Sequence, residues 1–380
     1  MLQMSNTMRL LLQHFSDYSL RFRSCMSKNI SVTTKQKSEV VECLNSRGIL
    51  RVSGKEASLF LQGLITNDMR HLEEGAQSMY TMFLNSKGRV MYDAIIYQLK
   101  EEDVFLIDCD KSAVSHLQRH LKVYRVRRKI DIENMEDKLK VWVVFDPKLA
   151  ESDESDTDVN KIKTVHKGQI ISPTIESAIN ESVINDLTKK RDDILICRDP
   201  RLSTLGVRIV APAGEDISLQ RGKGESVYQG MKLCYRAFRY KLGIGEGVND
   251  LPPENCFPLE ANGDYLHGVS FHKGCYIGQE LTARTHHTGV VRKRLMPIIF
   301  ETVPQTEFDV NTPIQVPSGS SKVSLGKLRG IEGSVGLALL RIAESLDVPR
   351  LKILDVTAKT MKPRWWPHEA PKERIFSGKG

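Results

Sequence analysis

The sequence predicts an α+β protein with two or three domains, the last of them a small domain made of β-strands. At 380 residues the chain is longer than a single hydrophobic core normally accommodates. Residues 104–145 follow the order strand, helix, strand, strand, which is typical of helices packed on one face of an antiparallel sheet. Residues 290–357 hold a series of short apolar runs separated by turn residues, and this pattern favours a small barrel or sandwich.

The composition is that of a globular protein, because 40% of the residues are hydrophobic and 27% are charged. No run of eighteen consecutive apolar residues occurs, so we expect no insertion into a membrane. The net charge of +8 is modest for this length and comes partly from the two ends of the chain. We therefore expect no nucleic-acid partner.

The first thirty residues are basic and rich in serine, with one acidic residue, Asp17, and a short apolar cluster at 10–12. This composition predicts a mitochondrial transit peptide over residues 1–35. A disordered tail is the alternative interpretation. A secretory signal is disfavoured because Gln13 and His14 interrupt the apolar cluster.

The first predicted strand covers 48–54 and leads into a helix. Ser53, three residues before Glu56, has the spacing of a capping box and predicts where that helix begins. Residues 79–99 have the pattern of a hairpin, in which Gly88 supplies the positive φ of the turn.

The middle of the chain is expected to continue with strands and helices. The predicted elements are, in order, a strand at 104–108, a helix at 112–121, strands at 125–133 and 139–145, and a helix at 225–242 that ends before Gly243. Five of the eight residues at 151–158 are acidic, which predicts a solvated loop rather than a metal site.

Seven cysteines are scattered along the chain, at positions 25, 43, 109, 197, 234, 256 and 275. Their odd number and the absence of a C-x-x-C pair argue against a disulfide framework, a zinc ribbon and an iron–sulfur cluster held by four nearby cysteines. If the protein takes part in iron–sulfur chemistry, a partner must therefore supply ligands.

Cys275 has the most reactive surroundings, because it lies in the segment HKGCYIGQELTAR at 272–284. A neighbouring cation such as Lys273 favours the thiolate, and Gly274 and Gly278 would let the backbone approach a ligand. The residues by themselves leave three interpretations open: a nucleophile, a metal ligand, or a small buried side chain. Nearby histidines could activate a nucleophile, but the sequence context of a cysteine hydrolase is missing.

The segment KGCYIGQELTAR, preceded by LGIGEG and PPENCFPLEAN, resembles the signature of the YgfZ-type folate-binding family of iron–sulfur cluster assembly factors. Upstream segments resemble the same family in the same order: RGILRVSGKEASLFLQGLITND, FLNSKGRVMYDAIIY, LQRHLKVYRVRRKI and DPRLSTLGVRI. The resemblance covers most of residues 45–350, and the transit-like start makes it strongest to the mitochondrial members.

The resemblance implies the fold of the glycine-cleavage aminomethyltransferase, in which three domains form a clover-leaf ring and tetrahydrofolate binds near the middle. It implies a discontinuous folate-binding-like core domain at 38–100 and 200–288, an inserted α+β domain at 101–199 and a β-barrel domain at 289–358. The composition of the end of the chain predicts a basic tail at 359–380.

The resemblance also implies a late step of [4Fe-4S] cluster maturation in the mitochondrial matrix, in partnership with A-type iron–sulfur carrier proteins. We expect the protein to be a monomer when alone. Cys275 falls on the family's cysteine, and we expect it to be a shared cluster ligand or a reactive thiolate. The predicted pocket residues are Lys273, Gly274, Tyr276, Gly278, Gln279, Glu280 and Arg284, with Asp93 and Arg239 as candidates for binding tetrahydrofolate.

Two other functions stay open. A folate-dependent aminomethyl or one-carbon transferase needs an acidic group near the folate nitrogen that carries the transferred carbon. Asp93 resembles the second of two adjacent aspartates in the transferase pattern, whereas Tyr92 replaces the first, and this departure disfavours transfer chemistry. A scaffold without ligand chemistry is the third interpretation, and it requires Cys275 to be buried.

Overall fold

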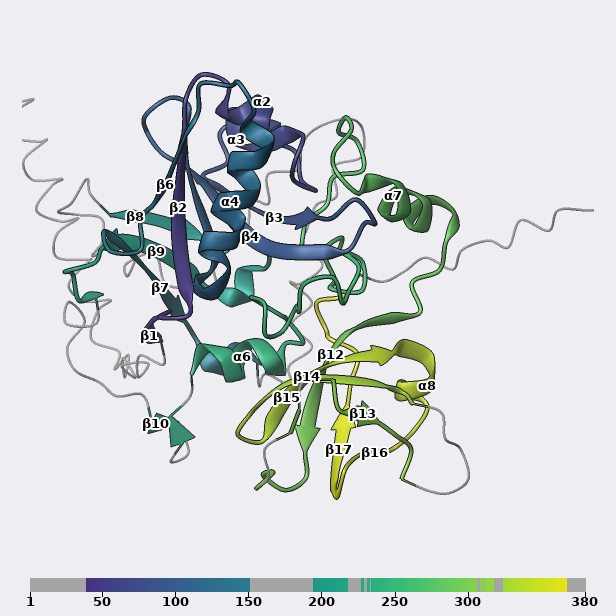
Figure 1. Ribbon diagram of the computed structural model, residues 1–380. Helices are drawn as coiled ribbons and strands as arrows, with labels where there is room; N and C mark the ends of the chain where they lie inside the picture. The colour runs from purple at the N-terminus through teal and green to yellow at the C-terminus, as the bar shows by residue number, and fades with distance from the viewer. Residues whose placement is uncertain are drawn as a thin grey trace, which may run out of the picture. The chain divides into compact units, whose positions relative to one another are not determined.

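The computed structural model describes residues 39–150, 194–217, 227–228, 231–232, 234–305, 308–309, 311–317 and 324–367 (Figure 1). All of these residues belong to one unit, Ser38–Gly380. The predicted transit peptide, the acidic segment 151–158 and the end of the predicted basic tail lie outside the described residues. Within the described ranges, no helix combines the length and the apolar character needed to span a membrane.

A five-stranded antiparallel sheet carries three helices. Its strands, in spatial order, are β3 (Ser78–Leu84), β4 (Val90–Gln98), β5 (Val104–Asp110), β2 (Arg47–Ser53) and β6 (Asp131–Asn134). Helices α2 (Ala57–Gln62), α3 (Arg70–Glu73) and α4 (Val114–Arg125) share one apolar cluster with this sheet. In α4, Val114, Leu117 and Leu121 recur at helical spacing, which places all three in that cluster.

Helix α2 begins differently from the sequence prediction. Its N-cap is Glu56, which makes no side-chain capping bond. Ser53 is instead the last residue of β2, where it pairs with Val104 on one side and Asp131 on the other. The predicted capping box is therefore wrong, because strand pairing keeps Ser53 in the sheet, and Gly54, with a φ of 131°, makes the turn into the helix.

A second antiparallel sheet has four strands. Their order is β1 (Val40–Cys43), β7 (Leu139–Phe145), β9 (Val207–Pro212) and β8 (Leu195–Arg198), and single 3₁₀ turns occur at Lys111–Ala113, Pro147–Ala150 and Ser203–Leu205. Side chains alternate along β7, so Val141, Val143 and Phe145 join the main core cluster with the first sheet, whereas Trp142 and Val144 belong to a separate cluster on the other face.

Strand pairing crosses the predicted domain boundaries at residues 100 and 200. β5 and β6 fall in the predicted insertion at 101–199, yet β5 pairs with β2 and β4, and β6 pairs with β2. β7 also falls in that segment and pairs with β1 and β9. The loop at residue 100 therefore connects two adjacent strands of one sheet, and the sequence cannot distinguish such a short antiparallel connection from a domain linker.

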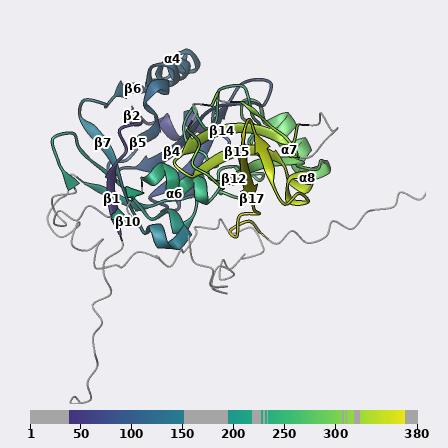
Figure 2. The same cartoon turned by 90° about the horizontal axis from the view of Figure 1, so that it is seen from below.

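The C-terminal sheet has six strands and closes almost completely. The order is β13 (Pro313–Ile314), β14 (Gly326–Glu332), β15 (Val335–Arg341), β12 (Lys293–Phe300), β17 (Val356–Thr360) and β16 (Leu351–Ile353), with the short helix α8 (Ile342–Leu346) after β15. Figure 2 labels β12, β14, β15 and β17 of this sheet, together with α8. An isolated bridge between Gln315 and Lys352 joins the two edges. The prediction of a C-terminal barrel is thus confirmed.

Helix α6 (Tyr235–Lys241) connects the barrel with the main core. It packs on β12, β14 and β15, and the rings of Tyr235 and Phe238 contact Phe145 of the second sheet. The helix is shorter than the predicted one at 225–242, because β10 (Val227–Tyr228) and β11 (Met231–Lys232) form a two-stranded hairpin before it.

The last described residues are packed against the barrel. The indole N–H of Trp365 donates a hydrogen bond to the carbonyl of Leu242 at 2.7 Å. Trp366 is buried in the apolar interior of the barrel. The predicted tail at 359–380 therefore starts within ordered structure, since its first residues belong to β17 and its tryptophans to the core.

Candidate functional site

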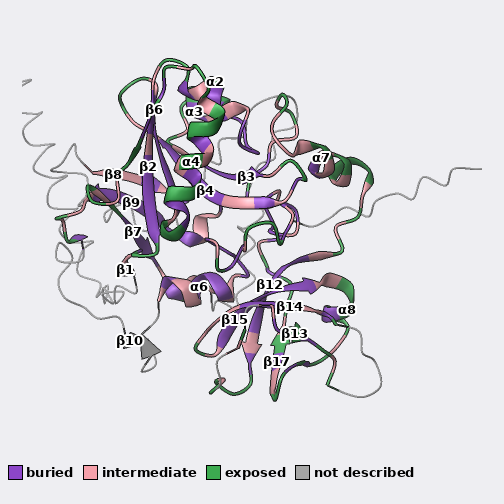
Figure 3. Ribbon diagram, in the orientation of Figure 1, coloured by how far each residue is buried: buried purple, intermediate pink, exposed green. Residues whose placement is uncertain are grey.

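Cys275 lies just before helix α7 (Gln279–Thr288), many of whose positions are exposed (Figure 3). Among the described cysteines it is the one exposed thiol: Cys109, Cys197 and Cys256 are buried, and Cys43 and Cys234 are half-buried. Burial raises the pKa of Cys197 and that of Cys256 to about 12, so these thiols stay protonated at neutral pH. Cys275 is therefore the described cysteine best placed to meet another molecule.

Lys273 holds the Cys275 loop in place. Its ammonium group donates hydrogen bonds to the carbonyl oxygens of Gln62 at 2.7 Å, Ile65 at 2.8 Å and Asn67 at 2.6 Å, at and just beyond the end of α2. An ammonium group has three N–H donors, so none is left for the thiol. Burial lowers the pKa of Lys273 to about 8. Lys273 thus anchors the loop to the end of α2, a role that the sequence analysis did not predict.

Gly278 packs against the turn between β3 and β4. Its φ is 78°, and a Cβ at this position would overlap the carbonyl oxygen of Asn85 and approach Gly88. The Asn85 side chain accepts hydrogen bonds from two backbone N–H groups of the turn, each at 3.0 Å, and the predicted hairpin is confirmed. Gly274, in contrast, has no atom within 4 Å of the place a Cβ would take, so the backbone beside Cys275 is open.

The other predicted pocket residues divide between the loop and the solvent. The side-chain carbonyl of Gln279 accepts a hydrogen bond from the backbone N–H of Tyr276 at 3.1 Å, which closes the turn into α7. Burial raises the pKa of Tyr276 to about 12, so its phenol stays neutral. Glu280 and Arg284 are exposed on α7. These two charged side chains are therefore accessible to a partner.

The loop and α7 are also joined by stacked rings. The rings of Phe271 and His286 lie 3.5 Å apart between centroids with an interplanar angle of 12°, and His287 packs edge-on against His286 at 5.1 Å. In the part of the chain that the structure describes, no group of three or more His, Cys, Asp or Glu side chains is arranged to hold a metal ion. The described residues thus offer one accessible thiol rather than a complete metal site.

A network of buried ion pairs links the five-stranded and the four-stranded sheets. The guanidinium group of Arg208 binds Asp108 at 3.1 Å, Asp199 at 3.2 Å, and Glu246. Arg201 binds Asp199 and Glu246, each at 2.7 Å. Burial by itself would raise the pKa of Glu246, yet the two arginines hold it well below its usual range. The arginines therefore lower the pKa values of Glu246 and Asp199 and favour their ionised forms in the interior.

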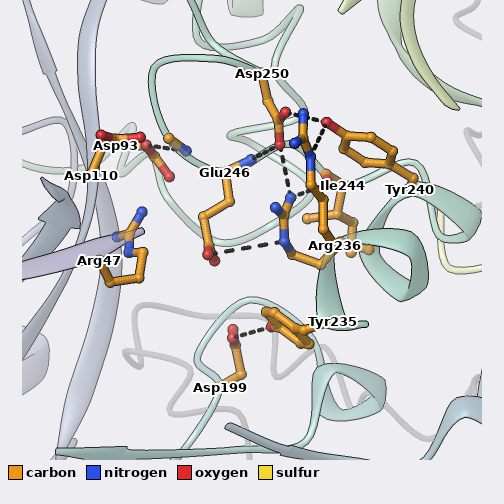
Figure 4. Close-up of polar contacts among 12 residues, drawn as sticks. Arg47, Asp93, Asp110, Asp199, Tyr235, Arg236, Tyr240, Ile244, Glu246 and Asp250 are labelled. Carbon is orange, nitrogen blue, oxygen red and sulfur yellow. Dashed lines mark hydrogen bonds and ion pairs between the residues drawn. The ribbon is translucent and has the colours of Figure 1, made fainter. Parts of the chain in front are cut away.

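Asp93 faces this network from β4 (Figure 4). Its Oδ1 accepts a hydrogen bond from the backbone N–H of Gly247 at 3.0 Å, whereas its Oδ2 is buried without a partner among the described residues. Burial raises the pKa of Asp93, and the charge of Arg47 opposes this rise. The hydroxyl of Tyr80 is likewise buried and unpartnered, and the guanidinium of Arg201 lies 5.4 Å from its ring centre. These unpaired oxygens fit a polar ligand that carries N–H groups.

Tyr92 belongs to the opposite face of β4 from Asp93, because successive residues of a strand alternate. Its ring packs with the apolar cluster beneath the helices. Of the consecutive residues Tyr92 and Asp93, only Asp93 therefore faces the buried network, and it presents one carboxylate there.

Arg239 is also part of the network, and its Nη1 is used while its Nε is buried without a hydrogen-bond partner among the described residues. Its guanidinium binds Asp250 and the carbonyl oxygen of Ile244, both at 2.9 Å. Asp93 and Arg239 are both buried, whereas Cys275 is exposed. The structure thus separates the predicted site residues into a buried polar network and a surface thiol loop.

The sequence analysis missed most of the network, whose unpredicted members include Arg47, Asp108, Asp199, Arg201, Arg208, Glu246 and Asp250. One signal was present, namely charges inside apolar strands, such as Arg208 in VRIVAP and Asp108 in VFLIDCD. Charged side chains are rarely buried unless they are paired, so such positions point to an interior ion pair.

Comparisons with known proteins agree with this architecture. Residues 31–165 match the family model of the GCVT N-terminal domain, and residues 292–368 match that of the CAF17 C-terminal β-barrel domain. The crystal structure of glycine cleavage system aminomethyltransferase T from Bartonella henselae superposes with a TM-score of 0.57 at 13% identity, covering 86% of each chain. The protein therefore has the aminomethyltransferase-like fold, with a C-terminal barrel.

Curated relatives match along most of the chain. The mitochondrial iron–sulfur cluster assembly factor IBA57 of Mus musculus is 36% identical over 341 residues, which is 86% of this chain and 85% of the relative. The protein of the same name from Homo sapiens is 35% identical, covering 85% of this chain and 84% of the relative. On this evidence the chain belongs to the IBA57 family of iron–sulfur cluster assembly factors.

Proposed function

We propose that this protein is a mitochondrial iron–sulfur cluster assembly factor that contributes the Cys275 thiolate to a cluster held jointly with another protein. The observation that carries the proposal is the exposure of Cys275 on a firmly anchored loop while the other described cysteines are buried or half-buried. The names of the relatives, which are mitochondrial assembly factors, support the same conclusion.

The number of available ligands favours a shared cluster. Iron–sulfur clusters are usually held by several thiolates, and the described residues provide one accessible thiol without a neighbouring group of metal ligands. A partner that supplies the remaining thiolates completes the site. We assign this role to an A-type carrier protein in the mitochondrial matrix, at a late step of [4Fe-4S] maturation.

The cellular test replaces Cys275 in cells depleted of the endogenous protein. The variants Cys275→Ala and Cys275→Ser are expected to fold and to be imported, yet to leave the activity of a mitochondrial [4Fe-4S] enzyme at the depleted level. Cys43→Ala is the matched control, because this half-buried thiol is expected to be dispensable. Full rescue by Cys275→Ala would reject the role of the thiol.

We propose further that tetrahydrofolate binds at the buried network. The unpaired Asp93 Oδ2 and Tyr80 hydroxyl would accept hydrogen bonds from N–H groups of the pteridine, and Arg239 would keep the network in place around it. Asp93→Asn is expected to weaken tetrahydrofolate binding at least tenfold in a fluorescence titration. Cys275→Ala should bind as the unmodified protein does, because the thiol lies at the surface.

The alternative function, aminomethyl or one-carbon transfer, is tested with the same protein. Purified protein with tetrahydrofolate and an aminomethyl donor should form product if the alternative holds. The transferase pattern has two adjacent aspartates, whereas here only Asp93 presents a carboxylate to the network and Tyr92 faces the other side of β4. This difference favours folate binding without transfer of a carbon unit. Folate binding without product would therefore eliminate the transferase alternative.

A further inference from the structure

A basic surface lies at the C-terminal end of α4 and in the turn that follows it. Six of the eleven residues at 119–129 are cationic: Arg119, Lys122, Arg125, Arg127, Arg128 and Lys129. The sequence contains no acidic residue between Asp110 and Asp131. We call residues 119–129 the α4 basic surface.

The cations of the α4 basic surface are not neutralised within the described parts of the chain. None of the six forms an ion pair with a described carboxylate. The nearby Glu133 pairs instead with Lys138. Arg125 donates to the carbonyl of Ile130 at 3.1 Å, a contact that leaves its charge uncompensated. A surface with one uncompensated sign of charge attracts anionic partners.

Three apolar side chains project among these cations. Val123 is 67% exposed, Tyr124 is 44% exposed and Val126 is 78% exposed. The buried face of α4 is made by other residues, so these three are not needed for the core. Single exposed apolar residues are common, but three within four positions, surrounded by cations, form a patch that suits an interaction.

The backbone turns Val126 outwards in an unfavourable conformation. The N–H of Arg128 donates to the carbonyl of Arg125 at 3.0 Å, and Val126 within this turn has φ 51° and ψ −108°. These angles belong to the first central position of a type II′ turn, which favours glycine. Neither local backbone preference nor packing explains a β-branched, exposed residue here.

We propose that the α4 basic surface docks on a membrane surface that contains anionic lipid. Val123 and Val126 would enter the headgroup region, and the cations would bind lipid phosphates. This combination of aliphatic tips and long basic side chains is typical of segments that lie in the interface. An acidic polypeptide would pair with the cations but leave Val126 in water. A nucleic acid would bind the cations through its phosphates but would likewise leave Val126 in water.

Vesicle flotation with the full chain tests this proposal. The protein is expected to float with vesicles of about four parts phosphatidylcholine to one part phosphatidylglycerol and to stay behind with pure phosphatidylcholine. Two double variants should each weaken binding at least tenfold. One is Val123→Ser with Val126→Ser, and the other is Lys122→Gln with Arg127→Gln. The matched control, Lys327→Gln with Lys352→Gln, removes the same charge from exposed barrel positions and should bind normally. The basic residues 1–35 are the same in every variant, so they cannot cause a difference in binding between the variants.

Three outcomes would overturn the proposal. Equal loss in the barrel control would show that net charge, not the α4 basic surface, drives the binding. Unchanged binding by the double serine variant would show that the apolar tips do not enter the lipid. Binding to polyglutamate without binding to either kind of vesicle would assign the surface to an acidic polypeptide.

Discussion

At the scale of single residues, Lys273 contributes most to the presentation of Cys275. The backbone beside Cys275 is open at Gly274, where a Cβ would have no atom within 4 Å, so the thiol depends on contacts made on either side of it. The three carbonyl oxygens that accept from Lys273 would lose these hydrogen bonds if the ammonium were removed. The position of the thiol therefore depends on a side chain whose ammonium donors are all used on backbone carbonyls.

Replacing Lys273 by methionine is expected to lower the free energy of unfolding by about 2–3 kcal/mol, because several partly buried carbonyls are left unpaired. Urea unfolding of the purified protein measures the change. Lys87→Met, in the exposed turn between β3 and β4, is the control and should change stability by less than about 0.5 kcal/mol. An equal effect of both substitutions would contradict the anchoring role.

Val126 gives a second prediction at this scale. Val126→Gly is expected to raise the free energy of unfolding by about 1 kcal/mol, because glycine adopts a φ of 51° and ψ of −108° without strain. Thermal unfolding checks the sign. The same variant should bind anionic vesicles more weakly, so stability and binding would change in opposite directions. A destabilised Val126→Gly protein would show that the turn is not strained.

At the scale of elements, the two glycines of the Cys275 loop have different roles. Gly278→Ala is expected to destabilise the protein by more than about 1 kcal/mol, because its φ is positive and a Cβ would overlap the backbone of Asn85. Gly274→Ala is the matched control and should be tolerated, since an added Cβ would have no atom within 4 Å beyond its chain neighbours. Chemical denaturation measures both. Comparable losses would mean that the loop does not rest on the β3–β4 turn.

Elements whose signals are local were predicted well, and those that depend on tertiary contacts were not. The hairpin around Gly88 and the C-terminal barrel follow from turn residues and alternating apolar positions. The capping box at Ser53 failed because pairing with two neighbouring strands outweighs a local capping preference. The helix at 225–242 was overextended because a short hairpin has the same mixture of apolar and polar residues as a helical face.

At the scale of the whole molecule, the buried ion pairs make stability depend on pH. The pKa values of Asp199 and Glu246 are lower in the folded state than their usual values of 3.8 and 4.5. Their stabilising contribution is therefore complete above about pH 4.5 and is lost as the pH falls below it. The raised pKa of Asp93 acts with the opposite sign and offsets part of this loss.

Glu246→Gln tests this account. The substitution is expected to cost about 3 kcal/mol at pH 7, because Arg201 and Arg208 lose a buried partner. The remaining stability should fall less steeply on acidification than that of the unmodified protein. Urea unfolding between pH 7 and pH 4 measures both effects. Parallel pH profiles for the two proteins would show that Glu246 does not titrate in the way described.

The candidate site was predicted in part. The sequence singled out Cys275 and its neighbours as candidates, because the motif is contiguous in the chain, and the exposure of Cys275 is compatible with that prediction. It did not predict that Lys273 and Gly278 serve the loop rather than a ligand, because their partners lie about 200 residues away in the sequence. The sequence also did not predict that Asp93 and Arg239 are buried while the thiol of Cys275 is exposed. Burial depends on packing between sheets whose strands are distant in the sequence.

The central claim is that Cys275 completes a cluster that a partner protein holds. The most direct measurement is anaerobic reconstitution of the protein with an A-type carrier, followed by absorption and Mössbauer spectra of the complex. The intact protein is expected to give a cluster signal that neither protein shows alone, and Cys275→Ala should not give it. The same spectrum and cluster content with Cys275→Ala would contradict the claim.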